Sequence, residues 1–453
     1  MDWVVTAIII GIGAYFAFQR SSFLVDYVII VFVFNRGLRR ILDYNAGAFN
    51  PLSPVSLTPL AITMLMLLPF LGRFSTLPKS HKTILTCFLV AMGYGFAIGF
   101  IRVQFAAIYA LAEVLAPIAM FGYILTLGAD QNTKDRWLRT SAWCAIVASA
   151  YGWYQYFTIP PWDAFWVRAV GFEGYMGTLE PTKMSVFSTM AERGVFGGFL
   201  GLAIVPMIIS PNWRTPLSWL GVILVLSNIL LAQTRTGIIL ATFTILVYVM
   251  INKGTGLFQM LIAMAVIGGA AWFGMDKMPG AEKLKDRFST LGNMQEDGSF
   301  QARMDIYSYG ISTILLNPVG FGLGATGISS RINTGDESNT AVITDAGYVE
   351  IVAQYGWLGA ILVVYALWAM WKQLAIRFKI GYRPTEVMLA RAFLIALIPA
   401  CFVGNMITQF SILWIIFGSA LDPRALGVFV QKLQMLKKAP EPSVPPGVAG
   451  QPA

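Results

Sequence analysis

The sequence is poor in the side chains from which most metal and nucleophilic sites are built. It holds one histidine, His81, and three cysteines, Cys87, Cys144 and Cys401, which lie far apart in apolar runs. This spacing matches neither a disulfide framework nor a Cys-x-x-Cys metal site. The histidine lies in a short basic loop, where we expect it to be solvated. We therefore predict that the protein uses no metal and no cofactor.

Charged residues are scarce as well. Only 12% of the 453 residues are charged and 57% are hydrophobic, whereas a soluble globular protein carries about 25% charged residues. Apolar runs of about 20 residues recur along the chain, which is the length needed to cross a hydrocarbon core about 30 Å thick. The sequence therefore predicts an all-α, polytopic integral membrane helical bundle of about 12–13 transmembrane helices.

The formal net charge of +9 does not indicate nucleic acid. Nucleic-acid binding needs a basic face, whereas here the basic residues lie mainly in short loops between apolar runs. That distribution is typical of topology signals and of contact with anionic lipid headgroups. We expect membrane lipids as partners and no nucleic acid.

The positive-inside rule orients the bundle. If the polar segment 276–346 is a large periplasmic loop, most basic residues of the other short loops fall on the cytoplasmic side, as the rule requires. Residues 1–275 then form a transmembrane bundle with a second periplasmic loop at 158–193, and residues 347–421 form the C-terminal transmembrane helices. Residues 422–453 end in a Pro-rich stretch and predict a disordered cytoplasmic tail.

The direction of the first two helices decides on which side of the membrane an arginine cluster lies. Residues 3–18 follow Asp2 and precede Arg20, whereas a signal peptide carries its positive charge before the apolar region. The first helix is therefore expected to be retained, with its N-terminus outside. A second helix over 22–36 then puts Arg36, Arg39 and Arg40 outside. If the first two helices cross the membrane in the opposite directions, this cluster is cytoplasmic.

Arginines at the outer membrane face oppose the charge bias, so each is expected to have a partner that offsets its cost. Besides the Arg36–Arg40 cluster they include Arg193 in AERG and Arg235 in the turn QTRTG. Carboxylates of the outer segments, Asp163 among them, are mostly expected to be solvated loop charges.

The large loop adds a further arginine and a carboxylate. Arg303 lies in the amphipathic stretch FQARMDIYSYGISTILL, where it either forms an ion pair with Asp305, Glu296 or Asp297 or clamps a phosphate with its planar fork. Asp345 lies where the loop re-enters the membrane, so partial desolvation should raise its basicity. A more basic carboxylate there is suited to act as a general base.

Gly322, Gly324 and Gly327 spell Gly-x-Gly-x-x-Gly, but no βαβ unit surrounds them. A dinucleotide site is therefore not indicated. A flexible turn after Asn317-Pro318 is expected instead, with free backbone N–H groups for an anion or with room for a close helix approach.

Four motifs in order resemble the O-antigen ligase and polysaccharide polymerase superfamily, the WaaL and Wzy proteins. They are QTRTG with Arg235, QARMDIYSYG with Arg303, NPVGFGLGATG, and DAGYVEIVAQYGWLG with Asp345, and the likeness covers roughly residues 186–371. The resemblance implies a GT-C-like helical fold, an undecaprenyl diphosphate-linked donor, no metal, and inversion at the anomeric carbon. Ligases carry a histidine eleven residues before the first glycine of their Gly-x-x-Gly motif. Here Asp345 stands at that point, which favours the polymerase and exopolysaccharide branch.

The resemblance also implies roles for the candidate residues. Arg235 and Arg303 would hold the diphosphate as it leaves, and Asp345 would take the proton from the acceptor hydroxyl. The further substrate-binding candidates are Arg193, Tyr348, Arg36, Arg39 and Arg40. No metal ligand is assigned.

The sequence therefore predicts a multi-pass glycosyltransferase of the bacterial inner membrane, with its active site facing the periplasm. It would polymerise undecaprenyl-diphosphate-linked repeat units into exopolysaccharide or O-antigen, with such glycans as donor and acceptor and with a chain-length regulator protein as a partner. One alternative is an O-antigen ligase that transfers glycan to lipid A or protein. Another is a flippase or transporter, although transporters usually carry inverted repeats and broken helices at the midplane.

Overall fold

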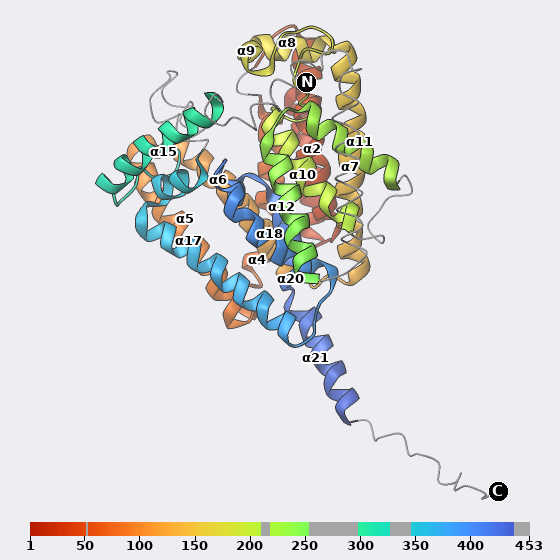
Figure 1. Cartoon of the computed structure of the whole chain (residues 1–453), viewed down its shortest axis with the longest axis vertical. Coiled ribbons are helices and arrows are strands. Elements are labelled where there is room, and N and C mark those ends of the chain that lie inside the picture. The colour runs from red at the N-terminus through yellow and green to blue at the C-terminus, as the bar shows by residue number, and fades with distance from the viewer. Residues whose placement is uncertain (51–52, 210–217, 253–297, 327–345, 439–453) are drawn as a thin grey trace, which may run out of the picture.

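A computed structural model describes residues 1–50, 53–209, 218–252, 298–326 and 346–438 of the chain (Figure 1). Within these ranges the chain forms helices and no strand, apart from one isolated bridge between Gly177 and Met184. The predicted all-α membrane fold is confirmed. The expected helix over 257–275 and most of the segment 276–346 lie outside the described residues.

The main helices of the bundle are α1 (Asp2–Phe18), α2 (Phe23–Ala46), α5 (Lys79–Val103), α6 (Phe105–Leu127), α7 (Gln131–Thr158), α10 (Arg193–Ile209), α11 (Ser218–Leu231), α12 (Arg235–Asn252), α17 (Gly347–Lys379), α18 (Thr385–Ala400) and α20 (Ser411–Leu421). The other elements are η1 (Pro54–Leu57), α3 (Thr58–Leu65), α4 (Leu67–Leu71), η2 (Phe74–Thr76), α8 (Pro161–Val170), α9 (Glu173–Met176), α15 (Gly298–Leu316), α19 (Met406–Gln409) and α21 (Pro423–Lys438).

Five segments of the described chain are long and apolar enough to cross a membrane: Pro54–Leu71, Lys79–Val103, Phe105–Leu127, Gly347–Lys379 and Ser411–Met435. Four shorter apolar helices are Asp2–Phe18, Arg193–Ile209, Trp219–Leu231 and Arg235–Ile251. Helices α2 and α7 are also long but carry several charges each. The described spans are therefore fewer than the number predicted from apolar runs alone.

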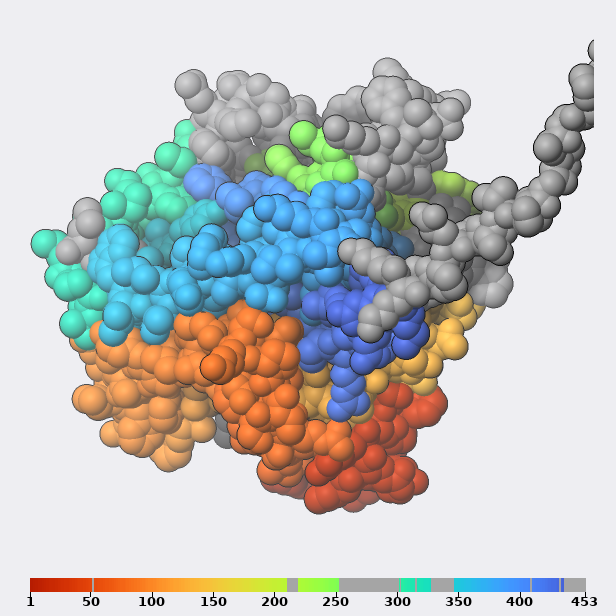
Figure 2. All heavy atoms as spheres, turned by 90° about the horizontal axis from the view of Figure 1, so that it is seen from below, coloured from red at the N-terminus to blue at the C-terminus, as the bar shows by residue number. Residues whose placement is uncertain are grey.

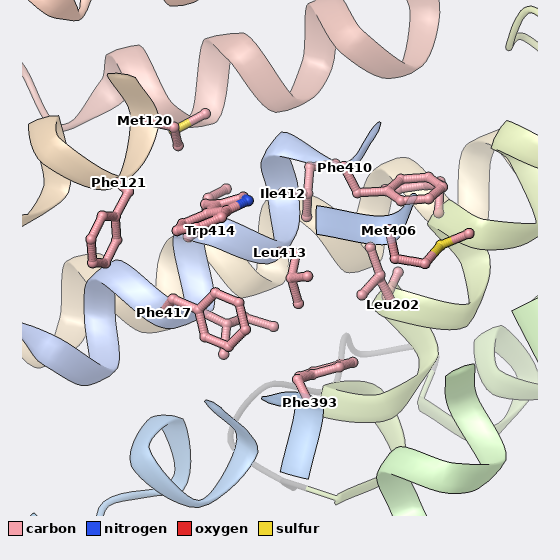
Figure 3. Close-up of a cluster of buried hydrophobic side chains, with 14 of the residues drawn as sticks. Met120, Phe121, Leu202, Phe393, Met406, Phe410, Ile412, Leu413, Trp414 and Phe417 are labelled. Atoms are coloured by element: carbon pink, nitrogen blue, oxygen red, sulfur yellow. The ribbon is translucent and has the colours of Figure 1, made fainter. Parts of the chain in front are cut away.

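Helix α20 lies at the centre of the core, where the close-up of Figure 3 shows its side chains among those of α6, α10 and α18. The indole ring of Trp414 packs edge-on against Phe88 and Phe121 at centroid distances of 5.2 and 5.3 Å. Its N–H donates to the Ile407 carbonyl at 2.8 Å. Residues Ile412–Leu421 of α20 are all buried, so this helix, apolar on all sides, contacts protein and not lipid.

The bundle has two ends, which we call the α8 end and the α21 end after the helices that lie there (Figure 1). The hydroxyl of Ser53 donates to Asp2 at 2.8 Å, and Arg40 pairs with Asp163 of α8 at 3.0 Å. The N-terminus, the arginine cluster and the segment 158–193 therefore lie together at the α8 end. This arrangement does not fit the alternative topology, in which the arginine cluster and the segment 158–193 would lie on opposite sides of the membrane.

The structure contains more helix than predicted in two places. Helix α2 runs to Ala46, so the arginine cluster lies on its last turns and not in a loop, and Gly47 ends it in the left-handed region with φ of 66°. The expected disordered tail 422–453 begins with a helix, α21. Its apolar residues Leu426, Phe429 and Leu433 recur at helical spacing, which the Pro-rich end of the tail concealed. Residues 439–453 lie outside the described residues.

The expectation of a solvated His81 is wrong, because this side chain is 3% exposed on the first turn of α5. Its Nε2 lies 2.7 Å from the carbonyl oxygen of Leu421 at the end of α20. Arg377 of α17 donates to the same carbonyl at 2.8 Å. Figure 2, which looks onto the α21 end, shows α17 beside α5. The two side chains thus satisfy the last carbonyl of the central helix, that of Leu421.

Candidate functional site

Two helices that start with arginine lie side by side at the α8 end. Helix α10 begins at Arg193 and α12 at Arg235, and the ribbons labelled α10 and α12 are adjacent in Figure 1. Their backbones meet at glycines: a Cβ on Gly237 would lie 2.1 Å from the Gly197 carbonyl oxygen, and one on Gly201 would lie 2.5 Å from that of Gly237. Only glycine allows this approach, which brings the first turns of both helices together.

This arrangement concentrates positive charge. A helix N-terminus carries the equivalent of about half a positive charge, and its first N–H groups have no partner within the helix. Two such termini with an arginine on each first turn therefore suit an anion such as a phosphate or diphosphate. The structure thus places side by side the helix starts that carry two of the predicted candidates, Arg193 and Arg235.

Arg193 is held by the segment between α8 and α10. Its side chain is 8% exposed, its Nη1 donates to the Ser185 hydroxyl at 3.3 Å, and its guanidinium lies 4.1 Å from the centroid of the Tyr175 ring. The Ser185 hydroxyl in turn donates to the Gln233 amide oxygen at 3.0 Å. The segment is therefore tied to the QTRTG turn, and the guanidinium has a fixed direction.

Backbone strain occurs at the same place. Gln233, directly before Thr234 and Arg235, has φ of 54°, and Ser188 has φ of 52°. Residues other than glycine seldom adopt positive φ, and such strain tends to cluster at functional sites. The Thr234 hydroxyl oxygen is buried without a hydrogen-bond partner. The QTRTG turn thus combines a strained backbone, an unsatisfied hydroxyl and an arginine.

Helix α15 and the start of α17 meet the end of α18. The Tyr307 hydroxyl donates to the Phe402 carbonyl at 2.9 Å and its ring stacks on Phe402 at 4.6 Å, while the Tyr348 hydroxyl donates to the Ile398 carbonyl. Arg303 lies one turn before Tyr307, on the same face of α15. Since α18 packs along α12, these contacts connect the Arg303 region to the Arg235 helix through α18.

Asp345 lies outside the described residues, so its distance to the arginines is untested. Neither the small apolar cavity beside Trp414 nor the open groove at Phe165 is lined by Arg193, Arg235 or Arg303. A cavity shared by the three predicted catalytic residues therefore stays a prediction. Among the described residues, no group of three or more histidine, cysteine or acidic side chains is placed to hold a metal.

The glycine-rich segment after Asn317-Pro318 makes the close helix approach that was one of its two predicted uses. A Cβ on Gly322 would lie 2.2 Å from the Gly99 nitrogen of α5. The Leu323 N–H donates to the Gly95 carbonyl at 2.8 Å, and the Trp357 N–H donates to Pro318 at 3.0 Å. Gly356, with φ of 61°, kinks α17 at this contact. The segment is thus wedged between α5 and α17 and fixes the helix that follows Asp345.

The arginine cluster of α2 has mainly structural contacts. The side chain of Arg40 is 1% exposed, pairs with Asp163, and donates to the Ser188 carbonyl. Arg39 lies 3.3 Å from the Asp43 carboxylate, and Arg36 faces Glu113 and Tyr109 of α6. These contacts meet the sequence-based expectation of a partner for each arginine. A role in substrate binding stays a prediction for the three.

Asp163 differs from the expectation of a solvated loop charge, because it is 0% exposed. Burial raises the pKa of its carboxyl, and Arg40, Tyr151 and Gln155 oppose that shift. The contacts of Arg193 with Ser185 and Tyr175 were not found from the sequence. Apart from their place in the loop before α10, these two residues gave no signal.

Comparison with family models gives one match in the region of these residues. Residues 220–364 match the family described as O-antigen ligase. The matched stretch includes the QTRTG turn, helix α15, the glycine-rich segment and the first half of α17. A search of curated proteins returns no match. Over this stretch the chain is similar to the O-antigen ligase family, which supports its placement with the O-antigen ligase and polymerase superfamily.

Proposed function

We propose that the protein polymerises lipid-linked oligosaccharide repeat units, with an undecaprenyl diphosphate-linked glycan as donor. The observation that carries this proposal is the pairing of Arg193 and Arg235 on adjacent helix N-termini. A diphosphate leaving group needs positive charge that is already in place when the glycosidic bond breaks. Guanidinium groups supply that charge in a planar fork that matches phosphate oxygens.

In the proposed reaction the acceptor hydroxyl oxygen attacks the anomeric carbon of the donor sugar. The bond from that carbon to the diphosphate oxygen breaks, and undecaprenyl diphosphate leaves with the electron pair and with inversion. Asp345 takes the proton of the attacking hydroxyl as a general base. Arg235 and Arg193 neutralise the leaving diphosphate from the helix starts, and Arg303 approaches from α15. Tyr348 orients the sugar or the base.

We favour a polymerase over a ligase because of Asp345, the residue at the point where the large loop re-enters the membrane. The superfamily's ligases carry histidine where this chain carries Asp345, so the acceptor is inferred to be another lipid-linked glycan and not lipid A. The second candidate is an O-antigen ligase, because the matched family carries that description. In either case the enzyme is inferred to lie in the bacterial inner membrane with its α8 end facing the periplasm. A chain-length regulator would be its protein partner.

The experiment is a deletion strain complemented with wild-type protein, Asp345→Asn or Arg235→Ala at equal protein levels. Loss of a polymerase leaves single repeat units on the final acceptor, whereas loss of a ligase leaves polymer on the lipid carrier. We expect single repeat units in both variant strains. Arg168→Ala is the matched control, since Arg168 is an exposed arginine on α8 paired with Glu173. Wild-type polymer in both variants would exclude the mechanism.

A further inference from the structure

Two guanidinium groups share one aromatic ring at the α21 end of the bundle, far along the chain from the candidate site. Arg383 lies 4.0 Å and Arg391 4.2 Å from the centroid of the Phe378 ring. Phe378 is on the last turn of α17, Arg391 is on α18, and Arg383 is in the short connection between them. Two like charges therefore lie within about 8 Å of each other, where they repel.

No described carboxylate balances this pair. Arg391 has its Nε and Nη1 buried without a hydrogen-bond partner. The single protein acceptor that Arg383 reaches is the backbone carbonyl of Phe378, at 3.3 Å within the described chain. Glu386, the acidic residue nearest to Arg391 along α18, is buried beside Lys134 and accepts nothing from Arg391. Buried guanidinium donors without an acceptor are costly unless an anion binds them.

The surroundings place the pair at the level of lipid headgroups. Helix α17 presents Tyr365 and Trp368 to the outside, with exposed fractions of 44% and 52%. The Lys372 ammonium lies 5.3 Å from the Trp368 ring, and Arg391 lies 5.0 Å from the Trp371 ring. Exposed aromatic residues with basic neighbours at the end of a membrane helix mark the interface between hydrocarbon and water. Arg391 is half-buried at this level and Arg383 is exposed.

We propose that Arg383 and Arg391 bind the phosphate of an anionic phospholipid on the leaflet at the α21 end. Stacking on Phe378 and Trp371 fixes the two planes, and the unpartnered N–H groups of Arg391 supply donors for phosphate oxygens. The acyl chains of such a lipid would lie along the exposed apolar residues of α17. Free phosphate has the same oxygens but lacks these chains, so it should bind far more weakly. The proposal does not depend on the glycosyltransferase reaction.

The test uses the full-length protein, purified in detergent and stripped of lipid. Its thermal unfolding is followed with dioleoylphosphatidylglycerol, dioleoylphosphatidylethanolamine or inorganic phosphate added. A ligand that binds only the folded protein raises the Tm, and the shift grows with the logarithm of the ratio of ligand concentration to Kd. We expect phosphatidylglycerol to raise the Tm of the wild type, and the other two additives to have little effect.

Arg391→Met keeps most of the side-chain volume and removes the charge, so its affinity for phosphatidylglycerol should fall about tenfold or more. Without lipid, its Tm should not fall, because an unpaired charge has been removed. Arg383→Met, at an exposed position, serves if Arg391→Met does not fold and should also reduce the shift. Lys79 is an exposed lysine at the start of α5, and Lys79→Met is the control, which should keep the full phosphatidylglycerol-induced Tm shift. An unchanged phosphatidylglycerol shift in the two arginine variants, or an equal shift with inorganic phosphate or phosphatidylethanolamine, would overturn the proposal.

Discussion

The guanidinium of Arg40 lies 3.0 Å from the carboxylate of Asp163, and the two side chains are 1% and 0% exposed. This ion pair fastens α8 to the last turns of α2. Arg40 also lies 4.7 Å from the centroid of the Phe187 ring, next to the segment that holds Ser185. The direction of Arg193 at the candidate site therefore depends in part on a buried pair that does not touch it.

Removing one partner of this ion pair should destabilise the protein more than replacing both partners with neutral side chains. Arg40→Met leaves a buried carboxylate uncompensated, and we expect a loss of about 3–5 kcal/mol. In the double variant with Asp163→Asn, the Asn oxygen still accepts from Tyr151 and Gln155, so most of that loss should be recovered. Thermal unfolding of the purified proteins measures both. A double variant as unstable as Arg40→Met would show that the charge of Asp163 is not the cause.

The same pair gives a pH dependence of known sign. Burial raises the pKa of Asp163 and Arg40 opposes that shift, so Arg40→Met should raise this pKa further. A carboxyl with a folded-state pKa above its unfolded value contributes stability at low pH, and the contribution is lost as pH rises through the raised pKa. The destabilisation by Arg40→Met should thus be smaller at pH 5 than at pH 8. In the Asp163→Asn background, this difference between the two pH values should vanish.

Two glycines of α5 offer a matched test of the wedge formed by the glycine-rich segment. A Cβ on Gly99 would lie 2.0 Å from the Leu323 carbonyl oxygen, whereas one on Gly93 would meet nothing within 4 Å. Gly99→Ala should therefore push the segment away from α5. We expect it to lower the free energy of unfolding by about 1–3 kcal/mol or more, which is typical of overpacking. Gly93→Ala should be neutral or stabilise the helix by up to about 1 kcal/mol. Equal Tm values for the two variants would mean that the segment does not pack as described.

The sequence predicted those parts of the fold that depend on local pattern. Apolar length predicted the helices, and the amphipathic stretch around Arg303 predicted α15. Local pattern also placed Arg193 and Arg235 at the same membrane face. The adjacency of their two helices could be seen only in the structure. It depends on the contact between Gly197 and Gly237, and nothing in the sequence indicates which glycine of another helix each one contacts.

Burial was less predictable than helix formation, since it depends on partners that are distant in the chain. His81 was expected to be solvated because its neighbours in sequence are basic, but its partner is the Leu421 carbonyl near the other end of the chain. Asp163 was expected to be solvated for a similar reason, and its partner Arg40 belongs to α2. The glycine-rich segment allowed two interpretations until Gly95 and Gly99 were seen to occupy its free backbone.

The proposed diphosphate site can be tested by a double-mutant cycle on Arg193 and Arg235. Removal of one preorganised donor should lower the rate by about 10²–10³-fold for Arg235→Ala. Arg193→Ala should have a smaller effect, because its guanidinium also stacks on Tyr175. Since both arginines would act on one leaving group, the double variant should be little slower than Arg235→Ala alone.

The measurement is the initial rate of undecaprenyl diphosphate release by purified protein in liposomes that contain a lipid-linked repeat unit. Arg168→Ala controls for the loss of an arginine at the same end of the bundle and should keep the wild-type rate. Rates that multiply across the cycle would mean that Arg193 and Arg235 bind separate groups. The adjacency of the two helix starts would then be structural, and the leaving group would have to be bound elsewhere.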